Sequence, residues 1–181
     1  MDYSQQAFIG DSEPVVSRFN SPKNKMGNGK PWGGMWTSTF TDYPEYSDWW
    51  NWCNEQNFYT VQGKSASLYI CHVRPTARIL HINSIEDIKN AHMRYELSPM
   101  KLPGINLKTF DYESMSKDYD ALHLSRRGYS EARNMLFDEE GYFWLFAGWD
   151  CESTCWLNMR FLSVVFWGYL DIPCEYHAER L

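Results

Sequence analysis

The stretch Gly148-Trp149-Asp150-Cys151-Glu152-Ser153-Thr154-Cys155-Trp156 places two carboxylates two residues apart, just before a long apolar run. Residues i and i+2 of a strand point to the same side of a sheet, so Asp150 and Glu152 would share a face. From Thr154 to Leu170 the chain is nearly all apolar, and Arg160 is its only charge. The stretch therefore indicates either a catalytic acidic edge beside an apolar core or a strand end whose acids simply face solvent.

Length and composition favour one folded domain, residues 1–181. Aromatic residues make up 17% of the chain, which argues against disorder. The net charge of -6 argues against a surface that coats nucleic acid, although it leaves room for a local basic groove. No apolar run is long enough for a transmembrane helix, and the polar N-terminus does not resemble a secretory signal. We expect a cytoplasmic protein with no membrane partner.

Five cysteines, an odd number without regular spacing, indicate reduced thiols. Cys151 with Cys155, or Cys71 beside His72, could contribute to a zinc site, but the paired spacing of zinc knuckles is missing. We therefore expect no metal, and cysteines that act as small buried apolar residues.

Short strands alternate with a few helices, which is the order of an α+β fold. Strands are predicted at residues 7–9, 36–40, 67–73, 77–82, 119–124 and 141–147. Ser47 is predicted to cap a helix over 49–57, and Ser84 with Asp87 to open another that ends near 95. A short helix is expected within 109–119, a loop with a short helix at 125–138, and a connection at 98–106, which holds two prolines and a glycine.

Residues 36–40 alternate large apolar and small hydroxyl side chains. Trp36, Ser38 and Phe40 would share one face of this strand, and Thr37 and Thr39 the other. A hydroxyl between two buried aromatic rings usually has a hydrogen-bonding task. The alternative is the ordinary preference of threonine for strands.

The loop from Arg18 to Lys30 carries four basic residues and no acid. It could close over phosphates, or it could be a solvated loop, which is the more common reason for a charge run. Together with the many aromatic residues, it keeps nucleic-acid modification open as an alternative function.

Familiar catalytic motifs are missing. The chain has no Walker loop, no Gly-x-Gly-x-x-Gly and no Gly-x-Ser-x-Gly elbow. A Cys-His nucleophile pair stays open, but no local pattern singles out one cysteine.

Four elements, in order, resemble the ADP-ribosyltransferase family, including its bacterial and phage members. They are Phe8-Ile9-Gly10 at the end of a first strand, the hydroxyl strand Thr37-Ser38-Thr39, the helix over 49–57, and Asp150-Cys151-Glu152. Their order and rough spacing agree with the family over most of the chain, whereas each motif alone is weak.

The resemblance implies an ADP-ribosyltransferase-like split, mainly antiparallel β core with peripheral helices. It also implies cleavage of the nicotinamide–ribose bond of NAD and transfer of ADP-ribose to a protein or nucleic-acid acceptor. Glu152 would stabilise the oxocarbenium-like transition state, Asp150 would act on the acceptor, and Ser38 would orient Glu152. The residues implied to bind NAD are Gly10, Asp11, Trp36, Thr37 and Thr39.

The chain departs from the family pattern twice. Ile9 stands before Gly10, where the family usually has Arg or His, and Asp150 replaces Glu or Gln. Either another cation (Arg18, Lys30, His72 or Arg74) takes over, or the chain is a catalytically silent binding protein with the same fold. The sequence leaves open the acceptor, the oligomeric state and whether the chain is a toxin with a cognate antitoxin.

Overall fold

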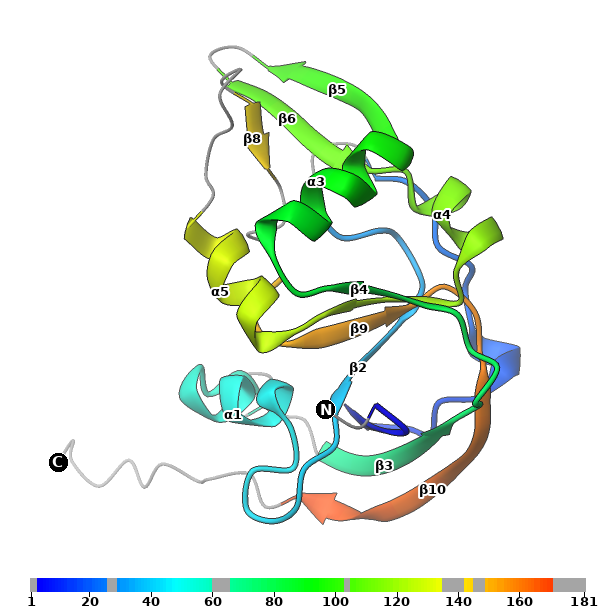
Figure 1. Cartoon of the computed structure of the whole chain (residues 1–181). Coiled ribbons are helices and arrows are strands. Elements are labelled where there is room, and N and C mark those ends of the chain that lie inside the picture. Colours follow the sequence, from blue (N-terminus) through cyan, green and yellow to red (C-terminus); the bar gives the residue numbers. More distant parts are fainter. Residues whose placement is uncertain are drawn as a thin grey trace, which may run out of the picture.

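A mainly antiparallel sheet of seven strands organises the molecule (Figure 1). The computed structural model describes residues 3–25, 29–59, 66–102, 105–134, 142–144 and 149–170. The strands, in their order across the sheet, are β10 (Phe161–Leu170), β3 (Ala66–Val73), β1 (Gln5–Gly10), β2 (Met35–Thr39), β9 (Ser153–Trp156), β7 (Ala121–Leu124) and β4 (Ile79–Ile82). Only β4 and β7 pair in parallel within this sheet. The fold is thus α+β, as the sequence predicted.

A second sheet of three strands contains β5 (Glu96–Leu102), β6 (Ile105–Phe110) and β8 (Tyr142–Trp144). The predicted connection over 98–106 is wrong, because most of it belongs to the antiparallel pair β5–β6. Pro99 lies where the register shifts between Leu97 and Met100. A proline cannot donate to the ladder, and an irregularity of this kind tolerates the missing N–H.

The described residues form four α-helices and one short 3-10 helix. They are α1 (Asp48–Glu55), α3 (Ile85–Arg94), α4 (Tyr112–Asp118), α5 (Arg126–Asn134) and η1 (Val16–Arg18). Both predicted caps are present: the Ser47 side chain accepts from Trp50 N, and that of Ser84 accepts from Asp87 N. These bonds satisfy N–H groups that have no partner within the helix. None of the described helices is long and apolar enough to cross a bilayer.

Two apolar clusters lie on either side of the junction between β2 and β9. The α1 cluster packs the buried Trp50 and Cys53 of α1 against Ala7, Ile9 and Leu68 of the sheet. The α3–α5 cluster joins helices α3, α4 and α5 to β4, β7 and β9, and its members include Ile82, Ile88, Met115, Leu124, Ala132 and Cys155. Figure 1 shows α1 and α5 on opposite sides of β9. The two clusters therefore flank the strand that follows the acidic motif.

A third cluster contains Trp156, which is fully buried and contacts Phe161 at 4.4 Å between ring centroids. Trp156 thereby anchors β9 against β10.

Some predicted features lie outside the described residues: Gly148 of the acidic motif, Cys174, and parts of the stretches predicted at 125–138 and 141–147.

Candidate active site

Glu152 is the residue around which the polar groups of the junction gather. It lies just before β9 and is only 3% exposed. Its carboxylate accepts hydrogen bonds from Ser38 Oγ at 2.5 Å, Thr39 Oγ1 at 2.9 Å and Thr39 N at 3.1 Å. All three donors come from β2, so the hydroxyl strand predicted from the sequence holds the carboxylate in one orientation.

The ionisation of Glu152 reflects two opposing effects. Burial raises its pKa, because a charged carboxylate loses solvation inside the protein. The hydrogen bonds from Ser38 and Thr39 lower the pKa, since an ionised carboxylate accepts but does not donate. Burial is the larger effect, so Glu152 takes up a proton at a higher pH than an exposed glutamate.

His123 of β7 approaches the same carboxylate from the other side. Its Nδ1 lies 2.8 Å from Thr154 Oγ1 and 3.4 Å from Glu152 Oε1. Burial lowers the pKa of His123 to about 3, so the ring is neutral at pH 7. The Tyr3 ring covers this imidazole, with 4.4 Å between centroids. Sequence reasoning missed His123, because it appeared only as one residue of a predicted strand.

A chain of buried hydrogen bonds continues from Glu152 through the sheet. Trp156 Nε1 donates to Thr37 Oγ1, which donates to Gln6 Oε1. Gln6 Nε2 then donates to Thr39 Oγ1, which donates to Glu152. The threonines of β2 thus link the carboxylate to β1 and β9. Gln6 gave no signal in the sequence beyond being a polar residue next to an apolar run.

A cavity of about 430 Å³ opens beside Glu152, between α1 and the start of α5, and we call it the Glu152 cleft. Its lining residues come from α1, α5 and the acidic motif: Asp48, Asn51, Trp52, Glu55, Gln56, Arg126, Tyr129, Asp150, Cys151 and Glu152. The cleft therefore offers carboxylates, two aromatic rings and one guanidinium to a ligand.

Asp150 also lines the cleft, but it is partly exposed and pairs with Lys30, whose Nζ lies 2.8 Å from Oδ2. Asp150 extends to a second cavity of about 70 Å³, which Trp36, Thr37 and Trp49 help to line. The two carboxylates therefore have different surroundings: Glu152 lies in the sheet junction, whereas Asp150 stands between two cavities. The structure brings together Ser38, Thr39 and Glu152, with Trp36, Thr37 and Asp150 nearby.

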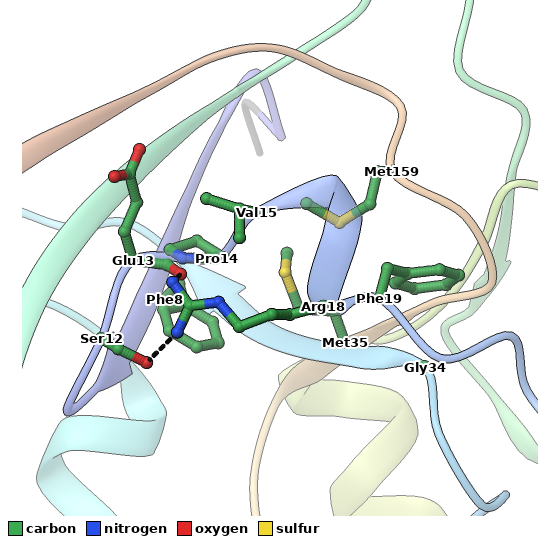
Figure 2. A pocket seen from close by; sticks show the side chains of 10 residues that line it. All are labelled: Phe8, Ser12, Glu13, Pro14, Val15, Arg18, Phe19, Gly34, Met35 and Met159. Carbon is green, nitrogen blue, oxygen red and sulfur yellow. Dashed lines mark hydrogen bonds between the residues drawn. The ribbon is translucent and has the colours of Figure 1, made fainter.

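Gly10 and Asp11 lie at the other end of the strands. Because β1 and β2 are antiparallel, with Gln6 opposite Thr39, the end of β1 points away from Glu152. The residues after Asp11 border a separate cavity of about 210 Å³, shown in Figure 2. There Arg18 extends toward Ser12 and donates to its Oγ at 2.9 Å. The structure thus does not place Gly10 and Asp11 beside Thr39 and Glu152.

The cations suggested as replacements for the missing first-strand Arg or His do not line the Glu152 cleft. Arg18 borders the separate cavity, Arg74 donates to Phe161 O, and Lys30 reaches Asp150 from the smaller cavity. Arg126 lines the cleft instead. It was overlooked in the sequence as one arginine of a polar segment.

Within the described ranges, no group of three or more His, Cys, Asp or Glu side chains is arranged to hold a metal ion. Comparisons with models of protein families, with curated proteins and with solved structures found no match to this chain. The functional interpretation therefore depends on the geometry of the site.

Proposed function

We propose that the protein is an ADP-ribosyltransferase, which cleaves the nicotinamide–ribose bond of NAD and transfers ADP-ribose to a macromolecular acceptor. The observation that carries this proposal is the bond from Ser38 Oγ to Glu152 Oε2. Together with the two donors of Thr39, it holds a buried carboxylate rigidly at the wall of a cleft. A fixed negative charge is suited to stabilise positive charge that develops in a transition state.

In the proposed reaction, the bond between the anomeric carbon and the nicotinamide nitrogen breaks. Its electron pair leaves with the nitrogen, so neutral nicotinamide departs and positive charge develops on the ribose. Glu152 stabilises that charge. A nucleophile then adds to the anomeric carbon and loses a proton, and Asp150 is the nearby group that would accept it.

The Glu152 cleft fits the mixed chemistry of NAD. The nicotinamide ring and its ribose carry the positive charge, for which the carboxylates of Glu152 and Asp150 are complementary. Trp52 and Tyr129 supply aromatic surface for a base or the nicotinamide ring, and Arg126 supplies a cation for the diphosphate.

The direct test is NAD turnover by the purified protein, measured as nicotinamide release by mass spectrometry, with and without protein and RNA acceptors. We expect Glu152→Gln to abolish release while the protein stays folded. Glu86→Gln is the matched control, because Glu86 is exposed on α3 and does not line the cleft. Turnover retained by a folded Glu152→Gln protein would overturn the catalytic assignment of Glu152.

The competing function is a catalytically silent binding protein. It would show no nicotinamide release from the wild type and no shift of the melting temperature with NAD. Nicotinamide release that Glu152→Gln removes and Glu86→Gln leaves intact would exclude this competing function.

A further inference from the structure

Arg126 and Asp48 form an ion pair at the Glu152 cleft. Arg126 Nε lies 2.8 Å from Asp48 Oδ2, and Nη2 lies 2.6 Å from Oδ1, so the guanidinium contacts both carboxylate oxygens. Both residues line the cleft. The neighbouring carboxylate raises the pKa of Arg126, which stays charged throughout the physiological range.

This ion pair joins two helices whose buried apolar residues belong to different clusters. Asp48 is the first residue of α1, whose Trp50 and Cys53 belong to the α1 cluster. Arg126 is the first residue of α5, whose Ala132 belongs to the α3–α5 cluster. A ligand that changes the pairing of Arg126 would therefore act on the contact between α1 and α5.

Among the described residues that line the cleft, Arg126 is the cation and Asp48, Glu55, Asp150 and Glu152 are the carboxylates. Asp150 pairs with Lys30, and Glu152 is held by Ser38 and Thr39. Asp48 is the carboxylate that occupies Arg126. The Arg126 side chain is 55% exposed, whereas that of Asp48 is only 18% exposed, so the guanidinium is accessible from solvent.

We propose that Arg126 is the diphosphate-binding residue of the cleft and that Asp48 occupies its guanidinium when no ligand is bound. This inference rests on the proposed function, because it assigns the diphosphate of NAD to Arg126. That residue lies outside the four elements that resemble the ADP-ribosyltransferase family. The planar guanidinium that now pairs with two carboxylate oxygens can pair in the same way with two oxygens of a phosphate. Binding of the diphosphate then exchanges one anion for another and releases Asp48 from Arg126.

The test uses ADP-ribose, which carries the diphosphate but undergoes no cleavage, and adenosine, which lacks phosphate. Binding of both is measured by calorimetry on the full chain. We expect Arg126→Ala to weaken ADP-ribose binding by about tenfold or more, the effect of losing a hydrogen-bonded charge, and to leave adenosine binding nearly unchanged. Asp48→Asn should tighten ADP-ribose binding, because the competing anion is gone.

Arg127→Ala is the matched control. Arg127 is the next residue of α5, pairs with Glu131 instead and does not line the cleft. Arg126→Lys provides a second variant if the alanine protein is unstable: it keeps the charge but loses the two-point geometry, and should bind ADP-ribose with intermediate affinity.

The outcomes separate the two proposals. ADP-ribose that binds the wild type and the folded Arg126→Ala protein equally well would overturn the role of Arg126 and leave the proposed function standing. Tighter binding to Arg126→Ala would also overturn it. A wild type that binds neither ADP-ribose nor NAD would overturn the proposed function together with this inference.

Discussion

The Ser38 hydroxyl and the Glu152 carboxylate lie 2.5 Å apart, although 114 positions separate them in the chain. The contact exists because β2 and β9 are antiparallel neighbours, with Thr37 opposite Thr154. This register carries Ser38 and Thr39 to the point where Glu152 precedes β9. A carboxylate placed there finds its donors on the adjacent strand instead of in solvent.

Ser38→Ala should lower NAD turnover by about tenfold to a hundredfold, because a hydrogen bond to a charged group contributes about 1.5–3 kcal/mol. It should also move the acid limb of the pH–rate profile to higher pH, since one group that lowers the pKa of Glu152 is lost. Steady-state kinetics across pH would measure both effects. Ser17→Ala, at an exposed position, is the control. An unchanged profile in Ser38→Ala would argue against an orienting role.

Stability should respond to pH through Glu152 and His123 with opposite signs. The pKa of Glu152 in the folded chain is raised above its ordinary value of 4.5. Between 4.5 and the raised pKa the folded chain holds more protons than the unfolded chain, so acidification stabilises the fold there. The pKa of His123 falls from 6.5 to about 3, so across that window the unfolded chain holds more protons and acidification destabilises the fold.

Melting temperatures between pH 7 and pH 4.5, the ordinary pKa of a glutamate, would separate the two groups. We expect His123→Asn to lose less stability on acidification than the wild type, and Glu152→Gln to lose more. His81, whose pKa burial also lowers, is present in both variants and contributes equally. Parallel curves for all three proteins would contradict the assigned pKa directions.

Thr37→Val should lower the free energy of unfolding by about 1–3 kcal/mol, because it leaves the buried Trp156 Nε1 and Gln6 Oε1 without their shared partner. Denaturant unfolding would measure the loss. Thr76→Val makes the same chemical change at an exposed position and should have little effect. Equal losses in both variants would show that the buried chain of hydrogen bonds contributes no stability.

Gly128→Ala should displace α5 and destabilise the fold by about 1–3 kcal/mol, the usual cost of overpacking. A Cβ at Gly128 would overlap the backbone oxygen of Ile82 in β4. The close approach therefore sets the position of α5 and of Arg126 at its start. Gly168→Ala is the control, since a Cβ there meets no atom within 4 Å. Thermal unfolding of the two variants would measure the difference, and equal stability would contradict this view of the α5–β4 contact.

Asp150→Asn should reduce transfer to an acceptor by about a hundredfold, as expected on loss of a general base, and leave ADP-ribose binding nearly unchanged. Binding should persist because Asp150 stands between two cavities and takes no part in the hydrogen bonds that hold Glu152. Product analysis by mass spectrometry would separate transfer from nicotinamide release. Loss of binding and transfer together would assign Asp150 to the ligand instead of the acceptor.

Local sequence patterns were enough to predict the features that depend on contacts between residues close together in the chain. Ser47 and Ser84 each cap their helix by accepting from the N–H three residues on, as predicted. The alternation of residues 36–40 predicted Ser38 and Thr39 on opposite faces of one strand, but both hydroxyls donate to Glu152. The hydrogen bond expected between Ser38 and Glu152 is present. Prolines misled the prediction at 98–106, because a register shift in β5 accommodates Pro99.

The sequence by itself determined the α+β class and the helix caps, because side-chain periodicity and capping act over a few residues. The pairing of the hydroxyl strand with the acidic motif was implied by the family resemblance and not by any local pattern. Only the tertiary structure decided which groups meet at Glu152. Through strand register, His123 approaches Glu152 and Gln6 contacts its donor Thr39, and Arg126 lies at the cleft because α5 packs closely on β4. It also separated Gly10 and Asp11 from the carboxylate, since β1 runs antiparallel to β2. Such contacts depend on pairing between distant segments, which no local pattern specifies.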